Sequence, residues 1–411
     1  MASGTSGPGL VEAFDAVVGG RAGVDRHAVF ERLREELPVF YSHRLESWVA
    51  TRYEDVRSVL RDDTRFEPPK HGAGAPAFGR SFLQMRGREH NKKVGIVARE
   101  MRSQRSLRER LDALVHEIAR TTASKLPLGE PVDLREQYAM WVPLLAITQL
   151  TGIHEAGRFR DWYRLIVAGG VSSISDPGAR AAAFRAREEV AAFLEPIIEE
   201  RRRSPGNDLV SDLVTAEYDG APLPHEEIVA TVIFLLAAGI ETTERVITSI
   251  LRHVALDPAE WAWLRANHGD PEALSAFSAE ALRVYPPVNG TMRVALDGVD
   301  FDGASVAAGD KVCVLIVSAN RDGTFFDDPH RFDHDRFKGR GDIQFTAAGD
   351  ILPFGAGNHH CAGSRLAQVE MAHAFTELIA RVGTIEPAGE LPAGEGFMLH
   401  SPPSLPVVLR A

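Results

Sequence analysis

The residue with the clearest capacity for chemistry is Cys361, which follows a glycine-rich loop and precedes a segment with helical spacing. Gly355 and Gly357 permit backbone angles and close approaches that a Cβ forbids. A cysteine at a helix N-terminus lies in a positive partial field, which favours the thiolate. Cys361 is therefore an axial ligand for a haem iron, a thiol for other chemistry, or a buried apolar side chain.

A second chemical group is the acid–alcohol pair Glu241–Thr242, which interrupts the longest apolar segment, residues 224–256. Proline and carboxylates at the start of this segment suit a helix N-terminus. Apolar residues on nearly all sides predict that the helix is buried. A buried carboxylate is costly unless it is paired or functional. Glu241 is thus either paired with Arg245 one turn further along or functional.

Residues 353–363 resemble the haem-ligand loop of the cytochromes P450, with the pattern Phe-Gly-x-Gly-x-His-x-Cys-x-Gly. All six fixed positions agree in type and spacing, which makes the match specific. The resemblance implies that Cys361 is the proximal iron ligand and that His359 donates to a haem propionate. The residues of this loop that it assigns to cofactor binding are Phe354, Gly355, His359, Cys361 and Gly363.

Residues 238–242 resemble the distal helix of the same family, with the pattern Ala-Gly-x-(Asp/Glu)-Thr. The resemblance implies that Ala238 borders the haem and that Gly239 loosens the helix for dioxygen. It assigns Thr242 a hydrogen bond to the activated oxygen or its water, and Glu241 a relay of protons from solvent. An acid and a hydroxyl are suitable because cleaving O2 requires two protons at one face.

A basic segment over residues 87–105 stands out in a chain of net charge −11. By itself such a segment is usually a solvated face. The family resemblance implies that His90 and Arg293 bind the haem propionates, and charge-assisted pairing suits both. Val94 stands where the family has arginine, and Lys93 is a candidate substitute. The resemblance further implies that the other cations form a docking face for an acidic redox partner such as a ferredoxin.

Glu280 and Arg283 share a helix face, since they are three residues apart. Alone they would be an ordinary surface ion pair of little energetic value. Together with the following prolines they resemble a buried structural motif of the P450s. The resemblance predicts that Arg336 is its third member and that the network supports the Cys361 loop.

The resemblance also predicts which residues line a substrate pocket. Most are apolar, with Asn289 and Thr291 as polar handles, which favours a small or medium hydrophobic substrate, aromatic or terpenoid. The resemblance places residues 71–79 beside this pocket, whereas without it they would be interpreted as a mobile surface loop. Residues 169–178 resemble a lid between two helices. The predicted pocket residues are Phe78, Phe82, Leu83, Ile166, Val167, Phe234, Ala237, Val288, Asn289, Thr291, Phe397 and Met398.

The predicted fold is mainly α with small β-sheets, namely the cytochrome P450 fold: a helical triangular prism with haem between two long helices. Residues 1–24 are expected to be a tail and residues 25–411 a single haem domain. The periodicity predicts helices over 25–37, 53–60 and 270–284, a hairpin from 39–43 and 47–51, and a buried strand over 311–317.

The composition indicates what kind of globular protein this is and which partners it is not expected to have. The 411 residues are 44% hydrophobic and 25% charged, which is ordinary for a globular protein. With only two cysteines, Cys313 and Cys361, a disulfide framework is not expected, and Cys313 reads as core. The acidic charge argues against nucleic acid as a partner. The N-terminus carries no apolar run able to span a membrane, so a cytoplasmic protein is predicted.

The resemblance implies the activity of a haem-thiolate monooxygenase that uses haem b, O2 and electrons from NAD(P)H through a ferredoxin. Hydroxylation, O-dealkylation and epoxidation are all compatible with the residues. A peroxide-driven haem-thiolate enzyme is the first alternative, although the Glu241–Thr242 pair favours O2. A non-catalytic haem protein or gas sensor is the second, and it would not need a proton relay.

Overall fold

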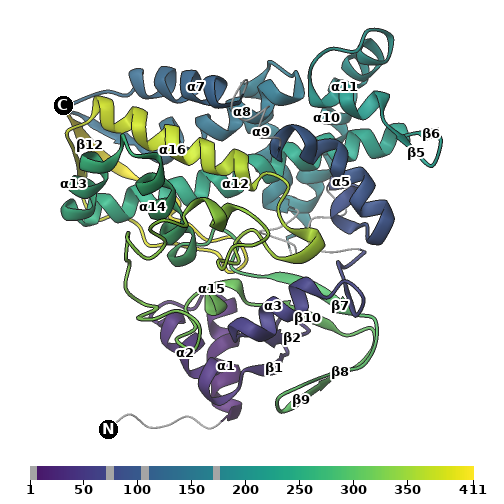
Figure 1. The fold of residues 1–411 in the computed structure, drawn as a ribbon, viewed down its shortest axis with the longest axis vertical. Coiled ribbons are helices and arrows are strands. Elements are labelled where there is room, and N and C mark those ends of the chain that lie inside the picture. Colours follow the sequence, from purple (N-terminus) through teal and green to yellow (C-terminus); the bar gives the residue numbers. More distant parts are fainter. Residues whose placement is uncertain (1–6, 71–77, 103–110, 170–175) are drawn as a thin grey trace.

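The computed structural model describes residues 7–70, 78–102, 111–169 and 176–411. It shows a large helical part, crossed by α12 and α16, beside a smaller part that holds α1, α2, α3 and most of the largest sheet (Figure 1). The described helices are α1 Gly7–Val18, α2 Arg26–Glu36, α3 Tyr53–Arg61, α5 Gly87–Arg102, α7 Asp112–Ser124, α8 Trp141–Thr151, α9 Ala156–Val167, α10 Pro177–Arg203, α11 Leu209–Thr215, α12 His225–Leu256, α13 Pro258–Asn267, α14 Pro271–Val284, α15 Ile316–Ala319 and α16 Ser364–Arg381.

The largest sheet has the strand order β1-β2-β10-β7-β3. The strands β1 Val39–Ser42 and β2 Ser47–Ala50 form the predicted antiparallel hairpin. β10 Lys311–Val314 runs parallel to β2 and antiparallel to β7 Thr291–Ala295, while β3 Phe66–Glu67 closes the edge. This pairing buries Cys313 completely, so its predicted place in the core is confirmed.

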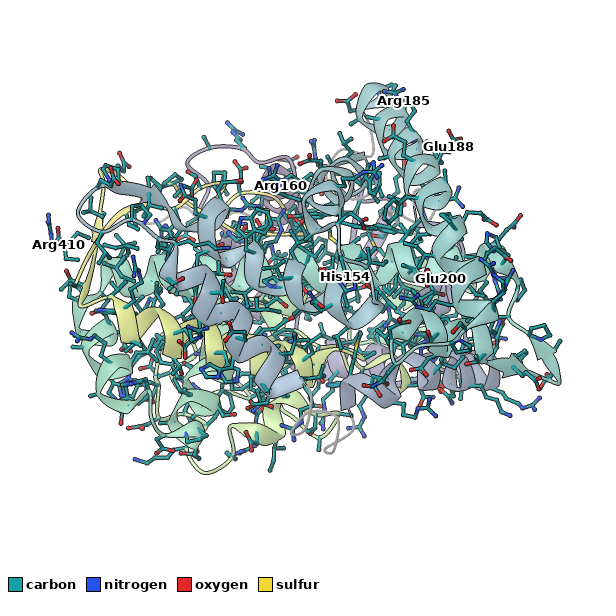
Figure 2. The ribbon with its side chains drawn as sticks, turned by 90° about the horizontal axis from the view of Figure 1, so that it is seen from above. His154, Arg160, Arg185, Glu188, Glu200 and Arg410 are labelled. Atoms are coloured by element: carbon teal, nitrogen blue, oxygen red, sulfur yellow. The ribbon has the colours of Figure 1, made fainter. Side chains whose placement is uncertain are left out.

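The smaller sheets lie elsewhere in the chain. A three-stranded sheet joins β11 Thr384–Pro387, β12 Pro406–Arg410 and β4 Pro131–Asp133, and two hairpins pair β5 Glu217–Tyr218 with β6 Ala221–Pro222 and β8 Val299–Phe301 with β9 Ala304–Val306. From above, Arg410 of β12 lies at one end of the molecule, and Arg185 and Glu188 of α10 lie at the other (Figure 2). The predicted class, mainly helical with small sheets, is confirmed.

The helix α12 forms the central rod of the helical part. Its side chains are buried on nearly every side, because α8, α9, α13 and α16 pack around it. Gly239 allows one close approach: a Cβ there would lie 3.3 Å from Cγ1 of Ile147 on α8. The helix runs unbroken through Gly239, so loosening at this glycine is not visible.

The structure differs from the expected tail over residues 1–24, because Gly7–Val18 form the helix α1. This helix buries Leu10 and Phe14, and the ring of Phe14 lies edge-on to Phe40 at 5.0 Å and to Phe397 at 5.6 Å between centroids. The burial of apolar surface explains the docking of a helix whose flanking residues are small and polar. The N-terminal segment therefore belongs to the packed structure from α1 onward.

The predicted Glu280–Arg283–Arg336 network is confirmed and is almost wholly buried. Arg283 donates to both carboxylate oxygens of Glu280 at 2.7 Å, and Arg336 donates to them at 3.1–3.2 Å. Arg283 also donates to the carbonyl oxygen of Asn320, whose Oδ1 accepts from the backbone N–H of Leu352 at 3.0 Å. The network thus reaches the start of the Cys361 loop through a single residue.

Candidate active site

One cavity of about 300 Å³ lies between α12 and α16. Its walls come from the loop before α16, from the middle of α12, from α5, and from the chain after α14. All eight residues predicted to bind a cofactor line it: His90, Ala238, Arg293, Phe354, Gly355, His359, Cys361 and Gly363. Residues separated by up to 273 positions in the chain therefore meet at one place.

The Cys361 loop is shaped by its two positive-φ glycines. Gly355 and Gly357 have φ of 71° and 69°, and a Cβ on Gly357 would lie 2.9 Å from the Cα of Arg61. The backbone N–H of Cys361 donates to the carbonyl oxygen of Phe354 at 2.8 Å, which closes the loop. The helix α16 starts three residues later, so Cys361 lies near a positive helix end.

Three basic side chains gather at one edge of the cavity. The rings of His90 and His359 lie 3.9 Å apart between centroids, and Arg293 borders the same space. Burial, with the charges of His90 and Arg293, lowers the pKa of His359 to about 3. Burial alone lowers the pKa of Arg293 to about 10. Such a crowd of buried donors is suited to an anionic group that enters from the cavity.

The proposed substitution of Lys93 for the missing arginine is wrong. The Nζ atom of Lys93 donates to Glu89 at 2.9 Å and to Glu227 at 2.8 Å, and it lies over the ring of Tyr218. Its ammonium is therefore committed to carboxylates outside the cavity. Val94 lines the cavity itself and leaves that position apolar.

The opposite wall comes from α12. Ala238, Gly239, Thr242 and Thr243 border the cavity, and Thr242 Oγ1 donates to the carbonyl oxygen of Ala238 at 2.9 Å. This bond to the preceding turn is common for threonine in helices. The hydroxyl of Thr242 thus has a resting partner within its own helix while facing the cavity.

Glu241 does not line the cavity, and it is ion-paired. Arg245 Nε donates to Glu241 Oε1 at 2.6 Å, and Arg245 Nη1 donates to Ser401 Oγ at 2.9 Å. Burial raises the pKa of Glu241, and the neighbouring Glu244 raises it further, while Arg245 opposes both. Of the two alternatives for this residue, the pairing with Arg245 is present; a role in proton transfer stays a prediction.

Glu370, which was not predicted from the sequence, lines the cavity from α16 and is fully buried. It accepts a hydrogen bond from Thr243, its Oε1 has no partner among the described residues, and burial raises its pKa to about 8. A signal was present, because Leu366 and Ala374 stand one turn to either side of Glu370. An acid on an apolar helix face is a candidate for a functional group.

The predicted substrate residues divide into two groups. Those that line the cavity are Phe82, Leu83, Phe234, Val288 and Thr291. Those that the structure places elsewhere are Phe78, Ile166, Val167, Ala237, Asn289, Phe397 and Met398. Residues 71–77 and 170–175, on which the predicted pocket loop and lid depend, lie outside the described residues.

Contacts with other parts of the chain explain four members of the second group, namely Phe78, Asn289, Phe397 and Met398. Phe78 packs edge-on against Phe234, 6.1 Å between centroids, and so lies behind a lining residue. The side-chain amide of Asn289 donates a hydrogen bond to the carbonyl oxygen of Phe397, and its backbone N–H donates to the carbonyl oxygen of Met398 at 2.8 Å. Phe397 faces Phe14 of α1. The C-terminal turn is thus a support for the cavity wall at Val288.

No helix among the described residues is long and apolar enough to cross a bilayer. The structure is thus that of a mainly helical protein with a cavity between the Cys361 loop and the middle of α12, where Thr242 lies. The family model for cytochrome P450 matches residues 147–267 and 271–403. The chain belongs to the cytochrome P450 family, and it is a P450 monooxygenase enzyme.

Individual proteins similar to this chain support the same family assignment. Cytochrome P450 107B1 of Saccharopolyspora erythraea is 31% identical, with 87% of each chain covered. Mycinamicin IV hydroxylase/epoxidase of Micromonospora griseorubida is 32% identical over 88% of this chain and 89% of the relative. The crystal structure of CYP109E1 from Bacillus megaterium with testosterone superposes with a TM-score of 0.80 at 25% identity, covering 94% of this chain and all of that one.

Membership of this family implies a haem, and the cavity fits one. A cysteine next to a helix N-terminus is a suitable iron ligand. The buried His90 and Arg293 and the partly buried His359 at one edge match the carboxylates that a haem carries there. The remaining walls are largely apolar, as a porphyrin face requires.

Proposed function

We propose that the protein inserts one oxygen atom of O2 into a small or medium hydrophobic substrate, with electrons from a ferredoxin. The observation that supports this most is that Cys361 and Thr242 border one cavity from opposite sides. A bound haem would supply oxygen activation, which the side chains of the chain cannot provide. The chain itself holds the cofactor, moves protons and shapes the pocket.

Cys361 is proposed to bind the haem iron as a thiolate. The N-terminus of α16 favours its negative charge, and the Phe354–Cys361 backbone bond fixes its approach. His90, His359 and Arg293 are proposed to pair with the propionates. This pairing would oppose the lowering of the His359 pKa, because an adjacent anion raises a histidine pKa.

Thr242 and Glu241 are proposed to deliver protons to the distal side. The Thr242 hydroxyl can release the carbonyl oxygen of Ala238 and turn its O–H into the cavity. Glu241 can accept a proton from solvent, because burial has raised its pKa and Arg245 is the partner it must leave. The acid therefore works only when the ion pair opens.

The proposed substrate is a hydrophobic organic molecule, and hydroxylation and epoxidation are the favoured outcomes. Phe82, Phe234 and Val288 give the distal wall an apolar surface, and Thr291 adds one hydroxyl. Mycinamicin IV and testosterone are named with relatives of this chain, and both names support an organic molecule as the substrate.

The proposed electron donor is a small acidic redox protein that binds near α5. Arg88, Lys92 and Arg99 are exposed on this helix. Arg88 pairs with Asp219 at 2.8 Å and Arg99 with Asp212 at 3.3 Å, so part of the charge is already balanced within the chain. An acidic partner would compete for these exposed pairs, which contribute little on their own.

The test is a compound screen followed by turnover. A substrate should shift the haem-loaded protein from low to high spin, and the same compound should give an oxygenated product with O2, NAD(P)H, a ferredoxin and its reductase. Product formation with hydrogen peroxide alone, and none with the electron-transfer proteins, would replace this proposal with the peroxide-driven alternative.

A further inference from the structure

A cluster of cationic side chains lies apart from the haem cavity, between the start of α2, the segment after α15, and the C-terminal turn. It contains Arg26 and His27 from α2, Arg321 from the segment, and His400 from the turn. None of these residues lines the haem cavity. Arg321 is buried and the other three are partly buried, and such a gathering of bases is unusual in a chain of net charge −11.

Both arginines have buried nitrogen atoms without a partner. Nε and Nη2 of Arg26 donate no hydrogen bond to any described residue, and neither does Nε of Arg321. Arg321 is only 7% exposed, and its one side-chain hydrogen bond to the described residues is from Nη2 to the carbonyl oxygen of Val284 at 3.1 Å. Buried guanidinium groups are normally paired, because an unsatisfied charge in the interior is expensive.

The acids nearest to these residues in the chain are engaged elsewhere. Asp25 caps α2 through the backbone N–H groups of His27 and Ala28. Asp322 accepts from the backbone N–H of Tyr53 at 2.8 Å and from Thr324 at 2.7 Å. Glu280 is held by Arg283 and Arg336. Among the described residues, no carboxylate therefore forms an ion pair with Arg26 or Arg321, and the nearby charge of Glu280 is already shared by two other arginines.

The first turn of α2 adds to the positive field. Cations are unfavourable at a helix N-terminus, where the macrodipole favours anions, yet Arg26 and His27 are the first two residues of this helix. The pKa of His27 is lowered to about 2 by burial and by the charges of Arg321 and Arg26. The pKa of Arg26 is lowered to about 10 for the same two kinds of reason.

We infer that this cluster is a binding site for an oxyanion, either a carboxylate or a tetrahedral anion such as sulfate or phosphate. Guanidinium groups present paired N–H donors that match the oxygens of such anions. The unpartnered nitrogens of Arg26 and Arg321 are the donors, and His27 adds a third base from the same helix turn. A bound anion would neutralise charges that otherwise destabilise the fold.

An anion bound at this site would also affect the wall of the haem cavity, because two residues of the site hold the chain that forms it. Arg321 holds the carbonyl oxygen of Val284 at the end of α14, and the backbone N–H of His400 donates to the carbonyl oxygen of Pro287 at 3.1 Å. Pro287 itself lines the cavity. An anion between α2 and the C-terminal turn would thus steady the same segment that borders a substrate.

The experiment measures thermal unfolding of the haem-loaded full chain in sulfate, phosphate, acetate or chloride at one ionic strength. Anion concentrations stay in the low millimolar range, below those at which sulfate stabilises proteins by exclusion. At least one oxyanion should raise the Tm saturably, by roughly 1–2 °C or more, while chloride does not. Acetate alone would identify a carboxylate site, and sulfate or phosphate would identify a tetrahedral-anion site.

Variants separate this site from general salt effects. Arg26→Met should lose the oxyanion response and be at least as stable as the wild type in chloride, since a buried unpaired charge is removed. Arg32→Met, on the same helix but exposed, should respond as the wild type does. Arg321→Gln should also lose the response; if it does not fold, Arg26→Met decides. No saturable shift for any oxyanion, or an unchanged response in Arg26→Met, would overturn the inference.

Discussion

Arg245 Nε donates to Oε1 of Glu241 at 2.6 Å, and the two side chains are 12% and 8% exposed. The acid proposed to relay protons is thus held by a cation one helical turn further along α12. Ser401 holds the same cation at 2.9 Å from the C-terminal turn. The pair must open before Glu241 can exchange a proton with the cavity side of the helix.

The first prediction concerns this pair. Arg245→Met should lower the free energy of unfolding by about 3–5 kcal/mol near neutral pH, because it leaves a buried carboxylate without its counterion. Arg32→Met is the matched control, since Arg32 and Glu36 form an exposed pair of the same spacing. That control should cost less than about 1 kcal/mol. Urea unfolding of the haem-loaded proteins measures both, and equal costs would count against a buried pair.

The second prediction concerns Thr242. Thr242→Ala should keep the consumption of NAD(P)H but divert reducing equivalents to hydrogen peroxide, because the hydroxyl no longer guides protons to the distal side. Thr248→Ala is the control, since Thr248 Oγ1 makes the same type of bond to Glu244 at 2.8 Å but does not line the cavity. Peroxide and product are measured against NAD(P)H consumed. Unchanged coupling in Thr242→Ala would contradict the proton role.

Residues in short, fixed patterns could be predicted from the sequence. The Cys361 loop, the acid–alcohol pair and the Glu280–Arg283–Arg336 network each depend on local spacing, and the network has the predicted contacts. Lys93 shows the limit of this reasoning. Its neighbour in sequence lines the cavity, but one step along a helix turns a side chain by about 100°, and Lys93 therefore faces Glu227.

The third prediction concerns pH and Glu370. Burial raises the pKa of its carboxyl from 4.5 to about 8, so the folded state holds a proton that the unfolded state releases. The free energy of unfolding should therefore fall as pH rises from about 5 to 8, by up to about 1.4 kcal/mol per pH unit from this group. Glu370→Gln should remove that part of the slope and be the more stable protein at pH 8.

The readout for Glu370 combines denaturation with infrared spectroscopy. Urea unfolding at several pH values gives the slope for the wild type and for Glu370→Gln. At pH 6 the wild type should also show the C=O stretch of a protonated buried carboxylic acid, and the variant should lack this band. Parallel pH slopes in the two proteins would show that Glu370 is ionised in the folded state.

Long-range packing explains what the sequence could not provide. Phe397 and Met398 were predicted to enter the pocket, but Phe397 packs on Phe14 of α1, a helix within the expected tail. No local sequence pattern can predict a contact between residues that are 383 positions apart. Glu370 was missed for another reason, because an isolated acid in a helix of mixed character resembles a solvent-facing residue.

The fourth prediction tests the basic edge of the cavity. Arg293→Gln should release haem to an acceptor apoprotein roughly tenfold faster than the wild type, because a charge-assisted hydrogen bond to a propionate is worth about 1.5–3 kcal/mol. Arg99→Gln, an exposed change on α5 outside the cavity, should leave the release rate unchanged. Equal rates for all three proteins would argue against a propionate contact at Arg293.

The carbon monoxide spectrum of the reduced protein tests the thiolate assignment most directly. The wild-type holoprotein should give the red-shifted Soret band of a thiolate-bound haem, and Cys361→Ser should lose it while Cys313→Ser retains it. Cys313 is the matched control, because it is buried in β10 and does not line the cavity. A Cys361→Ser protein that kept the thiolate band would contradict the assignment of Cys361 as the iron ligand.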